Sequence, residues 1–387
     1  MFFPISIHSI PCFTLFFILF LYILFNGDDI IEDQDSEYLY RVPYPIMRNS
    51  NNESWIKSEN IAIVIVLAEG VKREYYKIAI NSVECYAKAH GYQFILTHDN
   101  VWGCDYLKDK FFRRHCVISK ILPKYEAVLH LDADIGVVNQ KRKLQEYMNP
   151  QFDLIFHDRH FSPEIGMASY IVRNTQYGLD LITEFSNYEK KLPEGSFHGT
   201  DNGAIHMFLA EKLFPHNLIE LELCRRAWRN SQNVADQFAY TSCIRSLFGA
   251  NTDFGKVRIL RKVRSLSSVF RCPGVCMCVY LYHLYGTGYV RDDWLTSGIW
   301  SLDRDFMLHG LKTDHLKKVP YGPLRVSPMS QTSWYSPFEG DFDMERCVLG
   351  NTTWNHNPRL IGTREDVECG LRKHEMKIAV KKNHIYQ

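Results

Sequence analysis

Residues 127–134 read AVLHLDAD. The first five residues have the length and composition of a strand that is buried on both faces. Because side chains two positions apart in a strand point to the same side, we expect Asp132 and Asp134 to project together from the carboxyl end of this strand. Two neighbouring carboxylates repel each other unless a positive group joins them. A divalent cation that prefers hard oxygen ligands, such as manganese or magnesium, is the simplest such group.

The segments before this stretch alternate between strand and helix patterns. Residues 61–68 (IAIVIVLA) and 92–97 (YQFILT) have the composition of buried strands. Between them lies an amphipathic helix that ends at Gly91, and a basic helix over residues 110–122 precedes the third strand. The order strand, helix, strand, helix, strand predicts a doubly wound α/β sheet, in which ligands bind beyond the carboxyl ends of the strands.

Three interpretations of the aspartate pair are open. The pair could hold a metal ion and a diphosphate in a nucleotide-sugar transferase. It could instead be a phosphatase motif with Asp132 as nucleophile, although such a motif usually follows the first strand of its fold and here Asp134 leads into Ile135 rather than Thr. The third interpretation is a strand-end turn without chemistry. The chain has neither a P-loop nor a third glycine after Gly286 and Gly288, which argues against kinases, ATPases and dinucleotide binding.

Composition excludes other classes. The 387 residues include 45 Lys and Arg against 44 Asp and Glu, so the net charge of +1 leaves no global field that would attract nucleic acid. A hydrophobic content of 46% with 14% aromatic residues is too apolar for a disordered chain. We therefore expect a globular protein with a large core and no nucleic-acid partner.

The N-terminal segment predicts membrane attachment. Residues 1–27 contain no Asp, Glu, Lys or Arg, and residues 10–25 are almost entirely apolar. Without a basic start or a clear cleavage site, an uncleaved signal-anchor is favoured over a signal peptide that would give a secreted protein. The charges that follow are acidic, which predicts a single-pass type II protein with its body in the Golgi or endoplasmic reticulum lumen. Residues 28–57 read as a polar stem.

Cysteine usage suits an oxidising lumen. Ten cysteines lie outside the predicted anchor, an even number that is consistent with disulfides. Cys272, Cys276 and Cys278 are closely spaced, but no second cysteine pair lies near them, so disulfides or buried thiols are favoured over a zinc site. Two glycosylation sequons begin at Asn52 and Asn351.

A longer stretch around the aspartates carries a family resemblance. VLHLDADIGVVN, with the preceding KDKFFRRHCVISKILPKYEA, resembles the nematode family of nucleotide-diphospho-sugar transferases with the GT-A fold. More distantly, it is similar to the fungal α-galactosyltransferase and plant xyloglucan xylosyltransferase family. Residues 167–182, 200–206 and 307–312 resemble further segments of that pattern in the same order. The resemblance implies one GT-A-like catalytic domain over residues 58–312, with a Rossmann-like nucleotide-sugar half and an acceptor half, and leaves residues 313–387 as a C-terminal extension.

The resemblance also implies a metal site. Asp132 and Asp134 would hold a cation against the donor diphosphate, and His309 would supply a third ligand. An imidazole is a better ligand for manganese than for magnesium, so Mn²⁺ is the expected cofactor. Lys312 would face the diphosphate and neutralise the leaving group. Taken alone, His309 would be a packing residue and Lys312 a solvated lysine.

Asp201 and Asn202 are the remaining catalytic candidates. In the resembling families this position lies on the far face of the donor sugar, at the start of a helix, and retention of anomeric configuration is implied. Asn202 replaces the usual Gln, and its shorter side chain puts direct contact with the anomeric carbon in question. The alternative role of Asp201 is a helix N-cap.

Weaker candidates lie on two other predicted elements. Asp158 and Arg159, at the end of a strand over residues 153–159, could touch sugar or acceptor. Arg113 and Arg114 on the basic helix could reach the nucleotide, although a charged helix face is usually solvated. In the extension, a disulfide between Cys347 and Cys369 is one possibility and acceptor recognition is another.

The sequence as a whole predicts a membrane-anchored, lumenal, metal-dependent glycosyltransferase. Its donor would be a nucleotide-diphosphate sugar, UDP-hexose or UDP-pentose, and its acceptor a glycan or glycoprotein. The alternative is a catalytically inactive family member that binds sugar or protein in the lumen.

Overall fold

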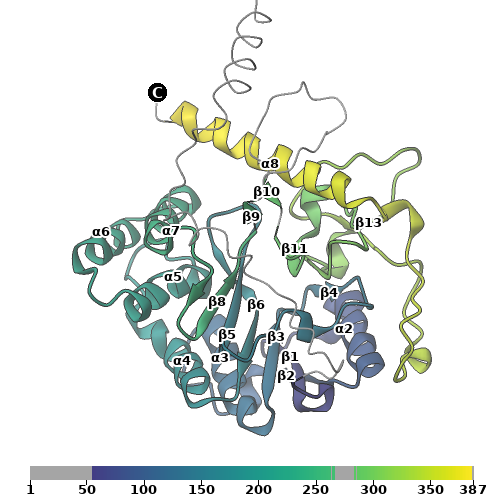
Figure 1. The fold of residues 1–387 in the computed structure, drawn as a ribbon, viewed down its shortest axis with the longest axis horizontal. Coiled ribbons are helices and arrows are strands. Elements are labelled where there is room, and N and C mark those ends of the chain that lie inside the picture. The colour runs from purple at the N-terminus through teal and green to yellow at the C-terminus, as the bar shows by residue number, and fades with distance from the viewer. Residues whose placement is uncertain (1–54, 263, 266–282, 285, 386–387) are drawn as a thin grey trace, which may run out of the picture. The chain divides into compact units, whose positions relative to one another are not determined.

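A seven-stranded mixed sheet organises the computed structural model, which describes residues 55–262, 264–265, 283–284 and 286–385 (Figure 1). Its strands lie side by side in the order β2-β1-β3-β6-β5-β8-β7. The bounds are β1 Ile61–Leu67, β2 Gln93–His98, β3 Ala127–Leu131, β5 Leu154–Asp158, β6 Ile165–Arg173, β7 Asp253–Phe254 and β8 Val257–Leu260. β1 is parallel to β2 and β3, whereas β6 is antiparallel to β3 and β5. The predicted doubly wound mixed α/β sheet is confirmed.

The first helices form where the sequence pattern predicts them. α2 (Lys77–His90) joins β1 to β2 and ends at Gly91, whose φ of 73° is the left-handed conformation that glycine adopts without strain. α3 (Lys110–Ile121) begins after Asp109, which accepts a hydrogen bond from the backbone N–H of Phe111 at 2.7 Å. This side-chain cap satisfies one of the free N–H groups at the helix start.

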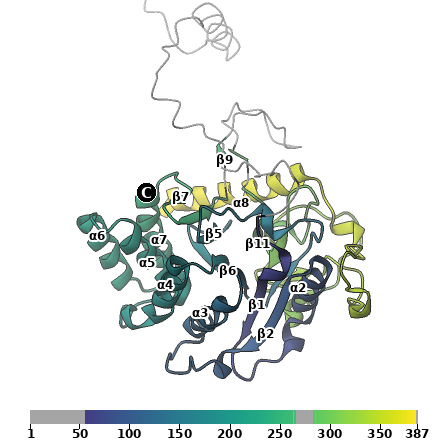
Figure 2. The ribbon, with the colours of Figure 1, turned by 60° about the horizontal axis from the view of Figure 1, so that its bottom comes forward.

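Helices cover both faces of the sheet (Figures 1 and 2). β2 lies on one side of β1 and β3 on the other, so right-handed crossovers place α2 and α3 on opposite faces. The α3 face also carries α4 (Gln176–Ser186), α5 (Thr200–Leu213), α6 (Leu218–Arg229) and α7 (Val234–Phe248). Val64 of β1, Phe112 of α3 and Phe185 of α4 belong to the large apolar core between this face and its helices.

A second, three-stranded sheet lies on the α2 side. It consists of β11 (Val290–Asp292), β12 (Met307–His309) and β4 (Ile135–Val137), with β12 in the middle. β4 pairs antiparallel with β12, and Ile135 lies opposite His309. Since only Asp132, Ala133 and Asp134 separate β3 from β4, the aspartate turn connects the two sheets. The shorter pairs are β9 (Arg264–Ser265) with β10 (His283–Leu284), and β13 (Leu316–Lys317) with β14 (Trp334–Tyr335).

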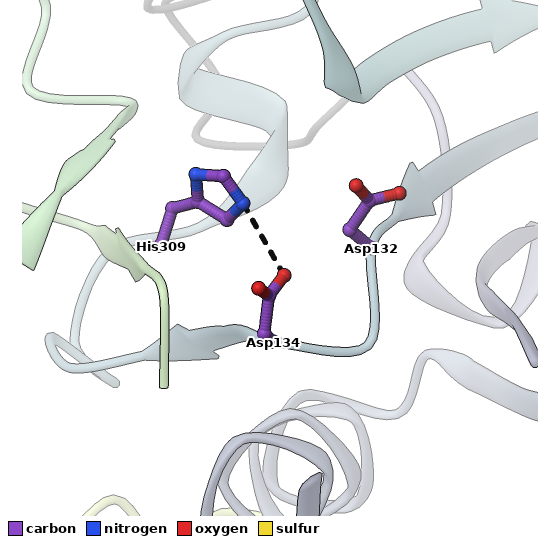
Figure 3. A group of neighbouring side chains, drawn as sticks. All are labelled: Asp132, Asp134 and His309. Carbon is purple, nitrogen blue, oxygen red and sulfur yellow. Dashed lines mark ion pairs between the residues drawn. The ribbon is translucent and has the colours of Figure 1, made fainter. Parts of the chain in front are cut away.

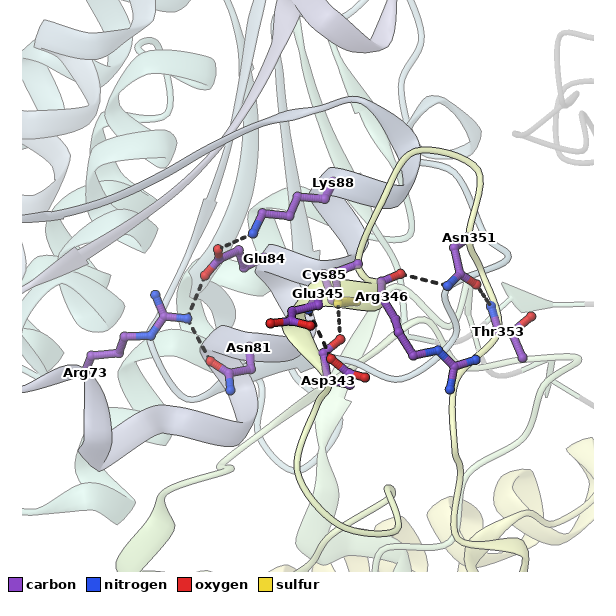
Figure 4. The surroundings of a disulfide bond; sticks show 11 residues. Arg73, Asn81, Glu84, Cys85, Lys88, Asp343, Glu345, Arg346, Asn351 and Thr353 are labelled. Atoms are coloured by element: carbon purple, nitrogen blue, oxygen red, sulfur yellow. Dashed lines mark hydrogen bonds and ion pairs between the residues drawn. A yellow bond between two sulfur atoms is a disulfide. The ribbon is translucent and has the colours of Figure 1, made fainter.

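The C-terminal extension is covalently attached to the rest of the fold. Cys347 forms a disulfide with Cys85 in the middle of α2 (Figure 4). The suggested Cys347–Cys369 pairing is therefore wrong, because the thiol of Cys347 is used in this contact. The extension ends in α8 (Arg364–Ile385). Trp334 and Val367 of the extension belong to an apolar cluster that also contains Ala79 of α2. The extension thus shares a core with the α2 side of the fold.

Two further disulfides link neighbouring elements. Cys104 pairs with Cys116 of α3, and Cys224 of α6 pairs with Cys243 of α7. The predicted anchor, the stem up to residue 54 with the sequon at Asn52, and the cysteines at 272, 276 and 278 lie outside the described residues. Within the ranges that are described, no helix combines the length and apolar character that a bilayer crossing needs.

Candidate functional site

Three potential metal ligands converge at the junction of the two sheets (Figure 3). Asp132 and Asp134 come from the turn between β3 and β4, and His309 ends β12. The backbone N–H groups of Gly310 and Leu311 donate to the carbonyl of Asp134 at 3.0 and 2.9 Å, which ties the end of β12 to the aspartate turn. One ligand atom from each of the three side chains lies within 4.8 Å of the others. The structure therefore brings together the predicted trio from segments far apart in sequence.

The imidazole of His309 is held by two carboxylates. Its Nε2 lies 3.2 Å from Asp134 Oδ1, and its Nδ1 lies 3.0 Å from Asp292 Oδ1. Burial alone would lower the pKa of His309, but Asp134 and Asp292 raise it to about 10. Although burial would raise the pKa of Asp134, His309 and Lys312 lower it below its usual value. The site thus stabilises a positive charge between these carboxylates.

The trio fits a divalent cation of the manganese type. Neighbouring ligands of an octahedral ion at ~2.1 Å lie about 3 Å apart and opposite ligands about 4 Å apart, so small side-chain movements suffice to bind one ion. When a metal ion replaces the proton between His309 and Asp134, two carboxylates and one neutral imidazole form a donor set that suits Mn²⁺. The side chains of Asp132 and His309 retain about a fifth of their exposure, 22% and 20%, which leaves them accessible to an ion. Asp292 would act as the outer carboxylate that orients a ligating histidine.

Lys312 lies beside the same carboxylate. Its Nζ is 3.8 Å from Asp134 Oδ2, and 37% of its side chain is exposed. The backbone turns sharply before it, because Gly310 has a φ of 103° that only glycine adopts easily. The carbonyl of Lys312 accepts a hydrogen bond from Trp334 Nε1 at 2.6 Å, which fixes the backbone at this position. The lysine is thus anchored at its backbone and has an exposed ammonium beside the metal ligands.

A buried arginine connects the metal site to α5. Arg114 donates hydrogen bonds to both Asp132 and Asp201 and is only 7% exposed. Burial would lower the pKa of Arg114, but the two carboxylates raise it. The expectation that this arginine is solvated is wrong, because α3 presents it to the carboxyl end of β3 rather than to water. Arg113, its neighbour, instead donates to the carbonyl of Leu107 at 2.7 Å.

Asp201 is fully buried at the start of α5. Its Oδ2 accepts from Arg114 and lies 3.1 Å from His115 Nε2, while its Oδ1 accepts from the backbone N–H of Asn202 at 2.8 Å. Burial would raise the pKa of Asp201, but Arg114 and His115 lower it well below its usual range. The N-cap position is taken by Gly199, so Asp201 is not the N-cap. Its carboxylate instead fixes the guanidinium of Arg114.

The side chain of Asn202 reaches from α5 to β6. Its Oδ1 accepts from the backbone N–H of Met167 at 3.3 Å, and its side chain is only partly buried.

The two weaker candidates from the sequence, Asp158 and Arg159, contact different partners. Arg159 lies 3.2 Å from Asp292 Oδ1 and thereby supports the carboxylate behind His309, whereas Asp158 pairs with Arg245 of α7 at 2.8 Å.

Asp292 was not among the sequence candidates. The local sequence carries little signal, because Arg291 separates Asp292 from the short apolar stretch around Tyr289 and Val290. A strand of three residues is too short for periodicity to identify. Its pairing with β12, which aligns Asp292 with His309, is a long-range contact that no local pattern contains.

The comparisons with known proteins identify the family. A family described as "Protein of unknown function, DUF273" matches residues 83–326, which is more than half of the chain. The chain belongs to the DUF273 family. The matched segment includes all three candidate metal ligands and Lys312. No curated protein matches this DUF273 chain.

Two solved structures are similar to parts of the DUF273 chain. One is a glycosyltransferase involved in the glycosylation of the major capsid of PBCV-1, with 19% identity over 35% of this chain and 70% of that chain and a TM-score of 0.30. The other is the glycosyltransferase GlyE of Streptococcus pneumoniae TIGR4, with 14% identity over 52% of this chain and 67% of that chain and a TM-score of 0.28.

Proposed function

We propose that the chain is a manganese-dependent glycosyltransferase that transfers a sugar from a nucleotide-diphosphate donor to a glycan or glycoprotein. The observation that carries this proposal is the convergence of Asp132, Asp134 and His309 at the carboxyl end of a central strand. That position is where α/β sheets bind their ligands. A UDP-hexose or UDP-pentose donor and retention of anomeric configuration follow the family resemblance.

The residues around the trio support the chemistry of a departing diphosphate. When bound, the cation supplies positive charge to the diphosphate oxygens. Lys312 adds a second positive charge beside Asp134, and its exposed ammonium can bind a phosphate that approaches from solvent. Because leaving-group stabilisation is a large part of such catalysis, we assign Lys312 to this step. Asp292 keeps Nε2 of His309 directed toward Asp134.

The buried charges behind the trio position it. Arg114 holds the carboxylate of Asp132, and Asp201 holds Arg114. We propose that Asp201 acts through Arg114, because its carboxylate is entirely buried. Asn202 is partly exposed and follows Asp201 directly, so we assign it to the donor-sugar side of the site. This arrangement separates a positioning role for Asp201 from a contact role for Asn202.

We also propose that the protein works in the Golgi or endoplasmic reticulum lumen. The disulfides Cys85–Cys347, Cys104–Cys116 and Cys224–Cys243 support an oxidising compartment. Attachment through residues 1–27 as a type II anchor remains the prediction from sequence.

Calorimetry with UDP and Mn²⁺ tests the proposed function. Full-length protein is titrated with UDP in the presence of Mn²⁺ and again in the presence of a chelator. We expect heat of binding only with the metal. Asp134→Ala should lose this binding, because it removes a ligand from the centre of the trio. Asp180→Ala is the matched control, because it removes an exposed aspartate on α4.

Two results would oppose the proposal. One is the absence of metal-dependent UDP binding by the wild-type chain, and the other is equal binding by Asp134→Ala. Either result would favour the alternative, an inactive family member that binds sugar or protein.

A further inference from the structure

A cavity of about 200 Å³ lies beside the Cys85–Cys347 disulfide and shares no lining residue with the metal trio. Apart from Cys85, all residues that line it belong to the segment 338–355, and we call it the 338–355 cavity. At ~30 Å³ per water molecule it has room for roughly seven waters, which is the scale of one sugar ring. Three acidic side chains near the disulfide would not make a site by themselves, but here they border a half-open cavity with an aromatic floor.

The floor of the 338–355 cavity is aromatic. Phe338, Phe342 and Trp354 pack edge to face, with ring centroids 4.6 Å apart for Phe338 and Phe342 and 5.1 Å apart for Phe342 and Trp354. Phe338 is buried, whereas Phe342 and Trp354 are only partly covered. Partly covered aromatic rings offer apolar contact area together with a polar edge. The C–H face of a pyranose ring is a partner of this chemistry.

The rim carries planar polar side chains. Glu339, Asp341, Asp343 and Asn355 line the cavity and are exposed, and Arg346 adds a cationic side chain to the lining. Carboxylates and amides can each bind two adjacent hydroxyl groups. Lys77 pairs with Asp341 at 2.6 Å, which leaves Glu339 and Asp343 against Arg346, and this negative balance repels an anion such as a nucleotide diphosphate. The charge of the lining therefore favours a neutral ligand rich in hydroxyl groups.

The loop that forms the cavity is held in place before any ligand arrives. The disulfide attaches it to α2, Asn351 Nδ2 donates to the carbonyl of Arg346 at 2.7 Å, and Asn351 Oδ1 accepts from the N–H of Thr353 at 3.0 Å (Figure 4). A preformed loop reduces the entropy that is lost on binding.

One contact relates the cavity to the metal site. Asp341 on the rim pairs with Lys77 at the start of α2 at 2.6 Å. Ser82 of α2 accepts a hydrogen bond at 3.1 Å from the backbone N–H of Val137 in β4, the strand that follows Asp134. Cys85 on the cavity floor follows Lys77 by about 12 Å along the helix axis at ~1.5 Å per residue. The cavity thus lies against the same helix as β4, the strand that follows Asp134.

We propose that the 338–355 cavity binds a neutral monosaccharide unit of the acceptor glycan. Sugar binding itself follows from the cavity, and only its role as an acceptor subsite rests on the proposed function. A glycan that lies along α2 would place one unit in the cavity while another reaches the metal site.

Saturation-transfer NMR on the full-length chain tests this inference. The probes are the methyl glycosides of glucose, galactose, mannose, xylose and N-acetylglucosamine, without metal or nucleotide. We expect at least one probe to bind. Trp354→Leu should weaken its binding roughly three- to tenfold, because it removes an aromatic ring that lines the cavity. Glu339→Ala, a change on the exposed rim, should weaken binding by a similar factor.

The control separates this inference from the proposed function. Asp134→Ala should bind the probe as tightly as the wild type, and UDP should not displace it. The inference is overturned if no probe binds, if both cavity variants bind like the wild type, or if Asp134→Ala abolishes binding. If the protein binds a sugar probe but does not bind UDP, the inference of a sugar-binding cavity stands and the proposed transferase function is wrong.

Discussion

Removing Arg114 is predicted to destabilise the protein strongly. The guanidinium is 7% exposed and joins Asp132 to Asp201, which is fully buried. In Arg114→Met, the neutral side chain fills part of the space but leaves Asp201 without its counter-charge. Burial lowers the pKa of His115 to about 4, so in the wild type this neighbour is neutral near pH 7 and Arg114 carries the counter-charge. Breaking a buried ion pair in this way costs about 3–5 kcal/mol.

Urea denaturation followed by tryptophan fluorescence measures this cost. Arg229→Met is the matched control, because that side chain at the end of α6 is half exposed and pairs with the exposed carboxylate of Glu222. Its loss should cost no more than about 1 kcal/mol. In an Asp201→Asn background the penalty of Arg114→Met should fall by roughly 0.5–3 kcal/mol. A penalty no larger than that of Arg229→Met, or one that is unchanged in the Asp201→Asn background, would refute the bridging role.

Three other predictions concern the disulfide, a buried acid and the histidine support. Replacing Cys85 and Cys347 by Ala removes a link between residues that are 262 positions apart, whereas the α6–α7 disulfide links residues 19 positions apart. In urea denaturation the first change should lower the free energy of unfolding by roughly 2 kcal/mol more than removal of the second disulfide. Equal losses would contradict this prediction. Burial raises the pKa of Asp293 to about 7. Its folded pKa thus exceeds the unfolded value of ~3.9, so stability falls as pH rises between these values. Asp293→Asn should therefore stabilise the protein far more at pH 8 than at pH 5, and equal denaturation shifts at both pH values would count against this. Asp292→Ala should weaken Mn²⁺ binding in calorimetry by roughly 10–100-fold, and unchanged affinity would remove its role in orienting His309.

Local patterns in the sequence predict the first half of the sheet well. β1, α2, β2, α3 and β3 each carry their own signal, whether a continuous apolar run or a helical repeat with a cap. The position of Asp132 and Asp134 follows from the end of β3, because the strand direction alone decides where its carboxyl end lies.

Long-range contacts account for what the sequence does not predict. The antiparallel insertion of β6 between β3 and β5, and the three-residue strands β4, β11 and β12, exist only through pairing with distant partners. The same reason explains Asp292, which approaches His309 through that pairing, and Arg114, whose burial depends on α5. The Cys85–Cys347 pair is separated by 262 residues, and pairing over such a distance has no local signal.

The most direct test of the central claim is release of UDP from UDP-sugars. Wild-type protein is incubated with a panel of UDP-hexoses and UDP-pentoses in Mn²⁺ or in a chelator, with Asp134→Ala in parallel. The proposed site predicts that Mn²⁺ supports UDP release from at least one donor, and that both the chelator and Asp134→Ala abolish it. Absence of release from every donor, or release that neither the chelator nor the variant affects, would contradict a metal-dependent transferase built on Asp132, Asp134 and His309.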